Sequence, residues 1–416
     1  MTEPNEGYVP SDEMYLWWLG CPDTPMQIGR LFYVPAVRGV GLRYSKHWLV
    51  HGFALSEDLP LRDQDFLPLE KDSAVGAVDD ARPDRWGERV IRVLDRPGRL
   101  SLMEYLYFAG DDRFGALGVS LSATSYVPRS RDALPRLSDL SAIEACIKKI
   151  EDGVALDERL TRLVSPGASM GGARPKALIA MEGNEWVLKF RESGEHTDTP
   201  LIEHATMRLA QQCGIHVADT MAVPLGRGHA VAVRRFDRSG KQRIHSLSAA
   251  VALRAIGEEP GYPALAQLIR RKGPVVSNHA RIDMCELFRR MVFNILIDNN
   301  DDHEKNHVLL MDESGYLRLS PAFDVLPTGQ ALSFQQMCVG LQGTKSTLDN
   351  ALSQHALFGL NRQEALQQIA LVCSCVSDWA TYFSNVGVSK ADVDLLREQI
   401  DRPFLLDQRR EWARKA

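Results

Sequence analysis

Cysteine is scarce in this chain of 416 residues, and its seven copies are scattered without a Cys-x-x-Cys pair. An odd number of thiols argues against a fully paired disulfide framework, and the spacing lacks the pattern of a thiolate metal site. Cys373 and Cys375 stand close together, but in an apolar stretch that we expect to be helical. Buried, reduced thiols are therefore favoured.

Long apolar runs are also absent. No segment approaches the roughly 18 consecutive apolar residues that a membrane helix needs. The first residues, Met1 to Glu6, contain neither the basic region nor the apolar region of a secretory signal. We therefore expect a cytoplasmic protein that does not engage a membrane.

An excess of positive charge is lacking as well. The formal net charge is −5 and the sequence pI is about 6.1. These values argue against an autonomous, strongly basic nucleic-acid binder, so any DNA contact would come through a partner. The 44% hydrophobic content is enough for substantial cores, and the length favours two or three domains.

The common phosphate-binding motifs are missing, since neither Gly-Lys-Ser/Thr nor Gly-x-Gly-x-x-Gly occurs. A loop of small residues is nevertheless present at 165–176, between two apolar runs. Its glycines, Gly167, Gly171 and Gly172, would let backbone N–H groups approach phosphate oxygens. By itself this is a weak signal.

The most informative pattern is Asn-Asn-Asp-Asp-His-Glu-Lys-Asn at 299–306, followed eighteen positions later by Asp324. Asp301 lies five residues before Asn306. This is the spacing that a phosphoryl-transfer site uses for one catalytic base and two side chains that hold Mg²⁺. The helical apolar period of Ile282–Ile297 and a hairpin predicted at 307–319 would place the motif on a loop between them.

Two other interpretations of this motif remain to be weighed. Asn and Asp favour turns, so 299–302 could be no more than a hydrated helix C-terminus. A calcium loop starting at Asp298 would need glycine at its sixth position and glutamate at its twelfth, where the chain has His303 and Leu309. The calcium loop is therefore rejected, whereas the hydrated helix end stays open.

A kinase-like site also needs a lysine on a strand and a glutamate on a helix, in that order. Lys189 interrupts the apolar run Trp186–Phe190, and Glu203 lies in the amphipathic segment Leu201–Cys213. Each residue alone is more simply a solvated charge. The order of loop, lysine, glutamate, base, asparagine and aspartate along one chain is what favours a kinase.

The residues resemble the HipA-like serine/threonine kinases, which are toxin components of bacterial toxin–antitoxin pairs. The likeness rests on the stretches 169–178, 187–190, 235–238, 301–306 and 321–324, and it extends to 52–56, 82–87 and 110–117 near the N-terminus. It implies ATP and Mg²⁺ as cofactors, with Asp301 as the catalytic base and Asn306 and Asp324 as metal ligands. Lys189 would hold the nucleotide phosphates, with Glu203 as its supporting ion-pair partner.

The resemblance implies a wider set of nucleotide-binding residues, which are Lys189, Ser169, Gly171, Gly172, Ala173, His303 and Asn306. It also implies that a serine in the glycine-containing loop is autophosphorylated, which switches the kinase off. Ser169 occupies the matching position, and Ser165 is a second candidate in the same loop. A phosphate there would repel the charges of a bound nucleotide.

The predicted fold is α+β: a two-lobed, protein-kinase-like fold with a small mixed N-terminal domain. We expect an accessory domain at 1–128, a strand-rich nucleotide lobe at 129–244 and a helical lobe at 245–416. In the first of these, 29–34 and 47–55 are predicted as strands, and 84–94 and 101–108 as helices.

The expected function is an ATP- and Mg²⁺-dependent serine/threonine protein kinase acting as a HipA-like toxin. The resemblance implies a HipB-like helix-turn-helix antitoxin as partner, DNA contact only through that complex, and an aminoacyl-tRNA synthetase or another translation factor as protein substrate. Two alternatives stay open: a phosphotransferase acting on an aminoglycoside or sugar, and a pseudokinase that works only through an antitoxin and DNA.

Overall fold

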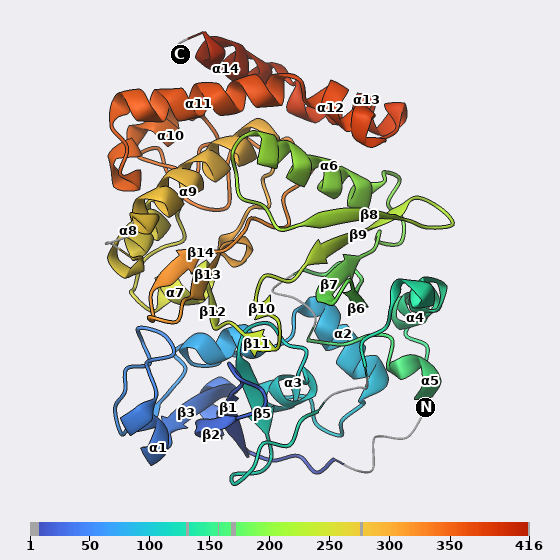
Figure 1. The fold of residues 1–416 in the computed structure, drawn as a ribbon, viewed down its shortest axis with the longest axis vertical. Coiled ribbons are helices and arrows are strands. Elements are labelled where there is room, and N and C mark those ends of the chain that lie inside the picture. Colours follow the sequence, from blue (N-terminus) through green and yellow to red (C-terminus); the bar gives the residue numbers. More distant parts are fainter. Residues whose placement is uncertain (1–7, 130–132, 157, 168–171, 275–277, 415–416) are drawn as a thin grey trace. The chain divides into compact units, whose positions relative to one another are not determined.

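The computed structural model describes residues 8–129, 133–156, 158–167, 172–274 and 278–414 (Figure 1). The chain forms two compact units: Met1–Lys189 with Arg234–Ile256, and Phe190–Val233 with Gly257–Ala416. Each contains helices and antiparallel strands, so the predicted α+β class is confirmed. The three-domain division expected from the sequence stays a prediction.

The first unit begins with a five-stranded antiparallel sheet of order β4-β3-β2-β1-β5. Its strands and helices are β1 (Glu13–Trp18), β2 (Met26–Val34), β3 (Gly39–Tyr44), α1 (Lys46–His51), β4 (Asp65–Phe66), α2 (Arg85–Leu94), α3 (Leu102–Phe108) and β5 (Leu117–Ser120). The strand predicted at 29–34 and the helices predicted at 84–94 and 101–108 are confirmed. Asp84 and Ser101 cap the two helices through their side chains.

The predicted strand at 47–55 is wrong. The segment starts with the short helix α1, and its N-cap Ser45 accepts a hydrogen bond from the backbone N–H of Trp48. Trp48 is buried, whereas Val50 is 73% exposed. A short apolar run is compatible with a strand and with one helical turn. Here the capping hydrogen bond of Ser45 favours the helix.

The rest of the first unit follows the accessory region. It contains α4 (Leu140–Glu151), α5 (Glu158–Thr161), the hairpin of β6 (Lys176–Met181) and β7 (Asn184–Lys189), and then β10 (Arg238–Ser239), β11 (Gln242–Arg243), β12 (Ser246–Ser248) and α7 (Ala249–Arg254). Strands β6 and β7 pair antiparallel from Lys176–Lys189 to Met181–Asn184.

The second unit is mainly helical. It contains α6 (Thr199–Gln212), β8 (Thr220–Pro224), β9 (His229–Arg234), α8 (Tyr262–Lys272), α9 (His279–Leu296), β13 (Val308–Met311), β14 (Leu317–Leu319), α10 (Leu348–Ser353), α11 (Arg362–Ser377), α12 (Trp379–Val386), α13 (Lys390–Ile400) and α14 (Pro403–Ala413). Helix α9 packs against α8, α11 and α14 (Figure 1). Its fully buried side chains include Leu287, Phe288, Met291, Val292, Ile295 and Leu296.

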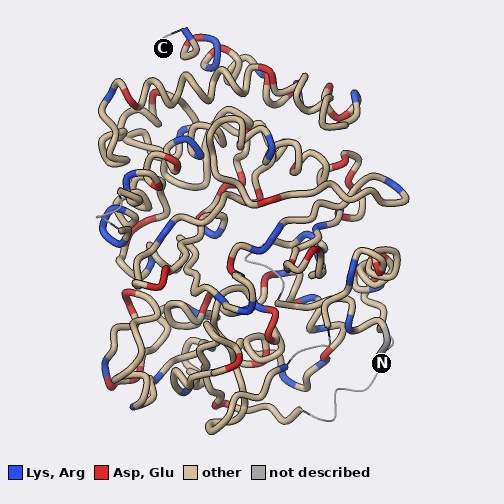
Figure 2. The backbone as a smooth tube through the Cα atoms, viewed as in Figure 1, with Lys and Arg blue, Asp and Glu red and all other residues tan. Residues whose placement is uncertain are grey.

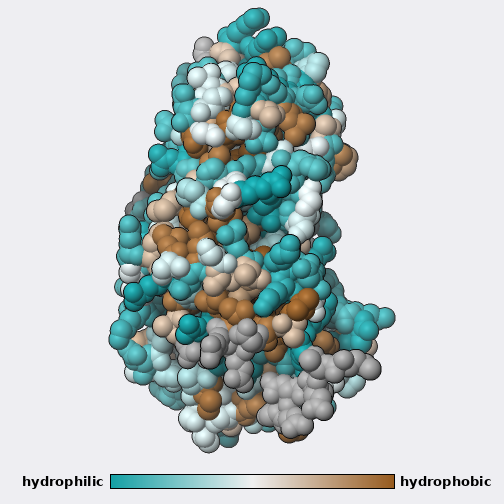
Figure 3. Space-filling model, turned by 90° about the vertical axis from the view of Figure 1, so that its right-hand side faces the viewer, coloured by the Kyte–Doolittle hydropathy of each residue, from teal (hydrophilic) through white to brown (hydrophobic). Residues whose placement is uncertain are grey.

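Charges of both signs are interspersed along the chain, as Figure 2 shows. On the face drawn in Figure 3, apolar residues are exposed in groups among hydrophilic ones. Among the described residues, none of the helices is both long enough and apolar enough to span a membrane.

A buried charge cluster ties distant segments of the first unit together. Arg235 and Asp237 are both almost completely buried, and Arg235 Nη2 donates to Asp237 Oδ2 over 2.7 Å. Arg238 donates to the same oxygen over 2.6 Å, and the backbone N–H of Gly115 donates to it over 2.8 Å. Gly115 has φ +78°, and a Cβ there would lie 2.7 Å from Ser246 Oγ. Glycine is thus required where the backbone meets the carboxylate.

We predict that Asp237→Ala lowers the free energy of unfolding by about 3–5 kcal/mol, because two buried guanidinium groups lose their counter-charge. Denaturant titration of the purified protein would measure the loss. The control is Asp394→Ala in α13, where Asp394 pairs with Lys390 at the surface, and we expect a change within about 0.5 kcal/mol. Equal losses in the two variants would contradict the structural role of the cluster.

Candidate functional site

The loop that carries the 299–306 motif follows directly from the end of α9. The short 3-10 helix Glu304–Asn306 and strand β13 come after it. At the start of the loop Asp298 has φ +58°, a left-handed conformation that is uncommon outside glycine. Two interactions hold it there: Arg402 Nη2 donates to Asp298 Oδ1 over 2.7 Å, and the backbone N–H of Thr328 donates to Asp298 O over 3.2 Å.

Burial separates Asp301 from the polar residues around it. The side chains of Asp298, Asn299, Asn300 and Asp302 are at most 2% exposed, whereas Asp301 is exposed. Polar groups are buried in this way only when partners replace water. The open alternative of a hydrated helix C-terminus therefore does not describe this loop.

The two adjacent aspartates have opposite surroundings. Asp302 is 2% exposed and accepts hydrogen bonds from the hydroxyl of Tyr262 and, over 2.8 Å, from Nε2 of His307. Asp301 instead accepts a hydrogen bond from Nε2 of Gln336 over 2.7 Å. Asp301 can reach a substrate, and Asp302 anchors the loop from inside.

The charge on Asp302 is stabilised by its partners. Burial by itself raises the pKa of this carboxyl, but the electrostatic attraction of His307 and the hydrogen bonds from His307 and Tyr262 outweigh it and hold the pKa below its usual value. Burial and the neighbouring carboxylate raise the pKa of Tyr262 well above its ordinary value. Tyr262 therefore stays a neutral donor.

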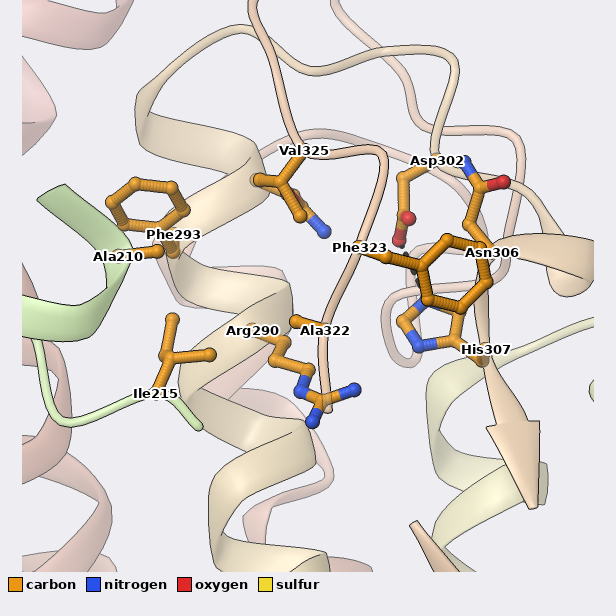
Figure 4. A pocket seen from close by; sticks show the side chains of 11 residues that line it. Ala210, Ile215, Arg290, Phe293, Asp302, Asn306, His307, Ala322, Phe323 and Val325 are labelled. Carbon is orange, nitrogen blue, oxygen red and sulfur yellow. Dashed lines mark hydrogen bonds and ion pairs between the residues drawn. The ribbon is translucent and has the colours of Figure 1, made fainter. Parts of the chain in front are cut away.

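Asn306 and the segment around Asp324 line one cavity (Figure 4). The cavity offers about 10 Å³ to the centres of water-sized molecules, room for about one water. Asn306, which is 6% exposed, borders it together with Asp302 and His307, and Phe323 and Val325 border it from either side of Asp324. The structure thus brings Asn306 close to the chain that carries Asp324.

Asp324 itself has φ +57°, so both ends of the motif contain an aspartate in left-handed backbone. Such conformations cost on the order of 1 kcal/mol or more and persist where the surroundings impose them, often at functional sites. At the start of the loop, the hydrogen bond from Arg402 stabilises this conformation of Asp298. The strain is therefore built into the two segments that meet at the cavity.

The side-chain oxygens of Asn306 and Asp324 are hard ligands of the kind that Mg²⁺ prefers. No group of three or more His, Cys, Asp or Glu in the described part of the chain could hold a metal ion alone. Mg²⁺ is commonly held by one or two carboxylates together with substrate phosphates. Asn306 and Asp324 fit that arrangement better than a cage made only of protein ligands.

In the first unit, Lys189 is the last residue of β7 and is 9% exposed. Its antiparallel neighbour Lys176 is 2% exposed and forms an ion pair with Asp84 over 2.6 Å. Asp84 also caps α2. The 82–87 and 169–178 stretches that carried the family resemblance therefore meet through a buried ion pair.

The small-residue loop is described only in part. Gly172 has φ +104°, which favours glycine, and Gly172 and Ala173 are exposed. Ser165 is 8% exposed, and nearby a Cβ on Gly167 would lie 2.5 Å from Ala109 O, so the start of the loop is packed against the accessory region. Ser169 and Gly171 lie outside the described residues.

Two other predicted residues lie in the second unit. Glu203, in α6, is 2% exposed. It and Lys189 belong to different units, so their ion pair stays a prediction. His303 has a buried Nδ1 that finds no hydrogen-bond partner among the described residues, and its role in nucleotide binding also stays a prediction.

No sequence pattern indicated that Tyr262 or Gln336 belongs to this site. Tyr262 lies 40 residues before the aspartate it contacts, and Gln336 lies 35 residues after Asp301. Asp302 lies in the motif and His307 directly follows it, and their separation of five residues is the same as that of Asp301 and Asn306. The pair of Asp302 and His307 could therefore have indicated a buried interaction beside the pair of Asp301 and Asn306.

We predict that Asp302→Asn lowers the free energy of unfolding at pH 7 by about 1.5–3 kcal/mol, because hydrogen bonds to a buried charge are lost. The folded-state pKa of Asp302 is depressed, so its contribution is complete above the unfolded-state pKa of about 4 and is lost as the pH falls through the lower folded-state pKa. Denaturation at several pH values should show the difference between variant and wild type shrinking in acid.

The neighbouring Asp301→Asn is the matched control for this experiment. Because Asp301 is exposed, we expect its replacement to change stability by no more than about 0.5 kcal/mol. A difference between Asp302→Asn and wild type that stayed constant down to the acid limit would refute the proposed charge stabilisation.

Comparison with known proteins gives this site a family. Residues 168–380, just over half of the chain, match the model of the HipA-like C-terminal domain. The serine/threonine-protein kinase toxin HipA of Shewanella oneidensis is 26% identical over 353 residues, which cover 75% of each chain. The putative kinase Y4dM of Sinorhizobium fredii is 29% identical over 158 residues, 35% of this chain and 38% of that relative.

A solved structure shows the same fold. It is the complex of HipA and HipB of the Shewanella oneidensis toxin–antitoxin system with operator DNA; its matching chain superposes with a TM-score of 0.66 at 19% identity, covering 97% of this chain and 99% of that one. The resemblance noted in the sequence is confirmed, and the chain belongs to the family of the HipA-like C-terminal domain.

Proposed function

We propose that the protein is an ATP- and Mg²⁺-dependent serine/threonine protein kinase of the HipA-like kind. The observation that best supports this proposal is the burial pattern of the catalytic loop: among residues 298–302, Asp301 alone is exposed. A base must reach the hydroxyl of its substrate, and the groups that position it must not move. The loop meets both requirements.

In this proposal each residue has a distinct task. Asp301 accepts or orients the proton of the attacking serine or threonine hydroxyl. Asn306 and Asp324 hold Mg²⁺, which when bound neutralises charge on the nucleotide phosphates. Lys189 holds the phosphates, and Gly172 and Ala173 offer backbone N–H groups at the exposed end of the small-residue loop.

On the basis of the family, we also propose a partner and a substrate. A relative of this fold was solved with HipB and operator DNA, and we propose a HipB-like antitoxin as partner, with DNA contact through that complex. The net charge of −5 agrees with a protein that does not bind DNA strongly on its own. The protein substrate is proposed to be a translation factor, such as an aminoacyl-tRNA synthetase.

We predict that Asp301→Asn abolishes phosphoryl transfer while the protein still binds Mg·ATP, because the variant lacks the base but keeps the proposed nucleotide ligands. Incubation with Mg·ATP followed by intact-mass measurement gives the first result, and isothermal titration gives the second. Asp407→Asn, at an exposed position of α14, should behave like the wild type. Equal phosphate incorporation by wild type and Asp301→Asn would remove Asp301 from this role.

Autophosphorylation provides a separate prediction. Ser165 is 8% exposed at the packed start of its loop, so we propose Ser169 as the modified residue. Phosphosite mapping after incubation with Mg·ATP should find phosphate on Ser169 in the wild type and in Ser165→Ala, and none in Ser169→Ala. Phosphate on Ser165 in the Ser169→Ala variant would contradict the assignment.

A further inference from the structure

A short segment, Phe334–Cys338, lies beside the catalytic loop, and we call it the flanking strip. Its side chains alternate between inside and outside. Gln335 and Met337 are at most 1% exposed, whereas Phe334 is 51% exposed and Gln336 is exposed. The strip bends at Gln336 and Met337, and its two buried side chains face inward while Phe334 and Gln336 face outward.

Both glutamines of the strip contact the catalytic loop, from opposite faces. The buried Gln335 donates from Nε2 to Ser346 Oγ over 2.9 Å and lies 3.5 Å from Asn300 Oδ1. The exposed Gln336 donates from Nε2 to Asp301 Oδ1 over 2.7 Å. The first contact secures the strip, and the second reaches the proposed base.

The far end of the strip is fixed to the start of α8. The backbone N–H of Cys338 donates to Pro260 O over 3.0 Å, and the N–H of Tyr262 donates to Cys338 O over 2.9 Å. Tyr262 then donates from its hydroxyl to Asp302. The strip is therefore connected to three successive residues of the catalytic loop: to Asn300 and Asp301 directly, and to Asp302 through Tyr262.

One contact of the strip, between Gln336 and Asp301, does not help to pack the strip against the protein. Gln335 and Met337 are buried and account for the way the strip is held, whereas the contact between Gln336 and Asp301 is made at the surface. An exposed carboxylate can otherwise rotate about its terminal bond. A donor anchored on the strip restricts that rotation, and a neutral amide does so without placing a full positive charge beside the base.

We infer that Gln336 is a positioning residue for Asp301 in phosphoryl transfer. Its amide N–H holds Oδ1 and turns Oδ2 toward the hydroxyl of the acceptor. In the step it supports, the acceptor oxygen forms a bond to the γ-phosphorus and the bond between that phosphorus and the β–γ bridging oxygen breaks. The electron pair leaves with ADP, and the acceptor proton goes to Asp301. The inference rests on the proposed kinase function.

The test compares Gln336→Ala and Gln336→Glu with the wild type. The glutamate keeps the size of the side chain but has no N–H to donate. We expect the rate of autophosphorylation at saturating Mg·ATP to fall by about 10- to 100-fold in both variants, because the base loses its fixed orientation. The half-saturating ATP concentration should stay within about two-fold of the wild-type value, since the side-chain hydrogen bond of Gln336 goes to Asp301 and not to a described nucleotide ligand.

Gln342→Ala, at another exposed glutamine shortly after the strip, is the matched control and should keep the wild-type rate. Wild-type rates in both Gln336 variants would overturn the inference. So would a joint change in rate, ATP requirement and thermal unfolding midpoint, because that would show a merely structural role. Absence of both nucleotide binding and phosphoryl transfer in the wild type would instead refute the kinase function, and the inference with it.

Discussion

The hydrogen bonds that Tyr262 and His307 donate to the buried carboxylate of Asp302 are the interaction on which the site depends. A buried charge without such partners would be too costly to keep, so the pair of donors fixes which way Asp302 faces. Asp301 lies in the turn just before Asp302, and its side chain is at the surface. Anchoring Asp302 inward therefore presents Asp301 outward, where chemistry is possible.

The same principle recurs in the rest of the second unit. Arg402 is the N-cap of helix α14, and it holds Asp298 in a left-handed conformation at the point where the 298–306 loop leaves α9. The flanking strip secures the middle of the loop through Gln335. Three segments that are distant in sequence thus constrain one short loop, and its position is set by tertiary contacts.

In the first unit, too, buried charged residues hold segments of the chain in place. Asp84 pairs with Lys176, and Asp237 pairs with Arg235. The first pair joins the accessory region to the strand-rich part directly. The second does so through the hydrogen bond that the backbone N–H of Gly115 donates to Asp237. A buried pair contributes little net stability compared with apolar packing, but it tolerates only one arrangement of its members. The accessory stretches 82–87 and 110–117 contribute Asp84 and Gly115 to these contacts.

Local sequence patterns were enough to predict the α+β class, helix α9, the hairpin after it and the spacing of Asp301 and Asn306, because periodicity depends on neighbouring residues. The prediction was wrong at 47–55, where one capping serine outweighed an apolar run. Tertiary contacts, in contrast, set the outward direction of Asp301 and the inward direction of Asp302, and they bring Tyr262 and Gln336 to the site. Those assignments depend on side chains 35 to 40 residues away, and no local pattern encodes which distant donor a carboxylate will meet.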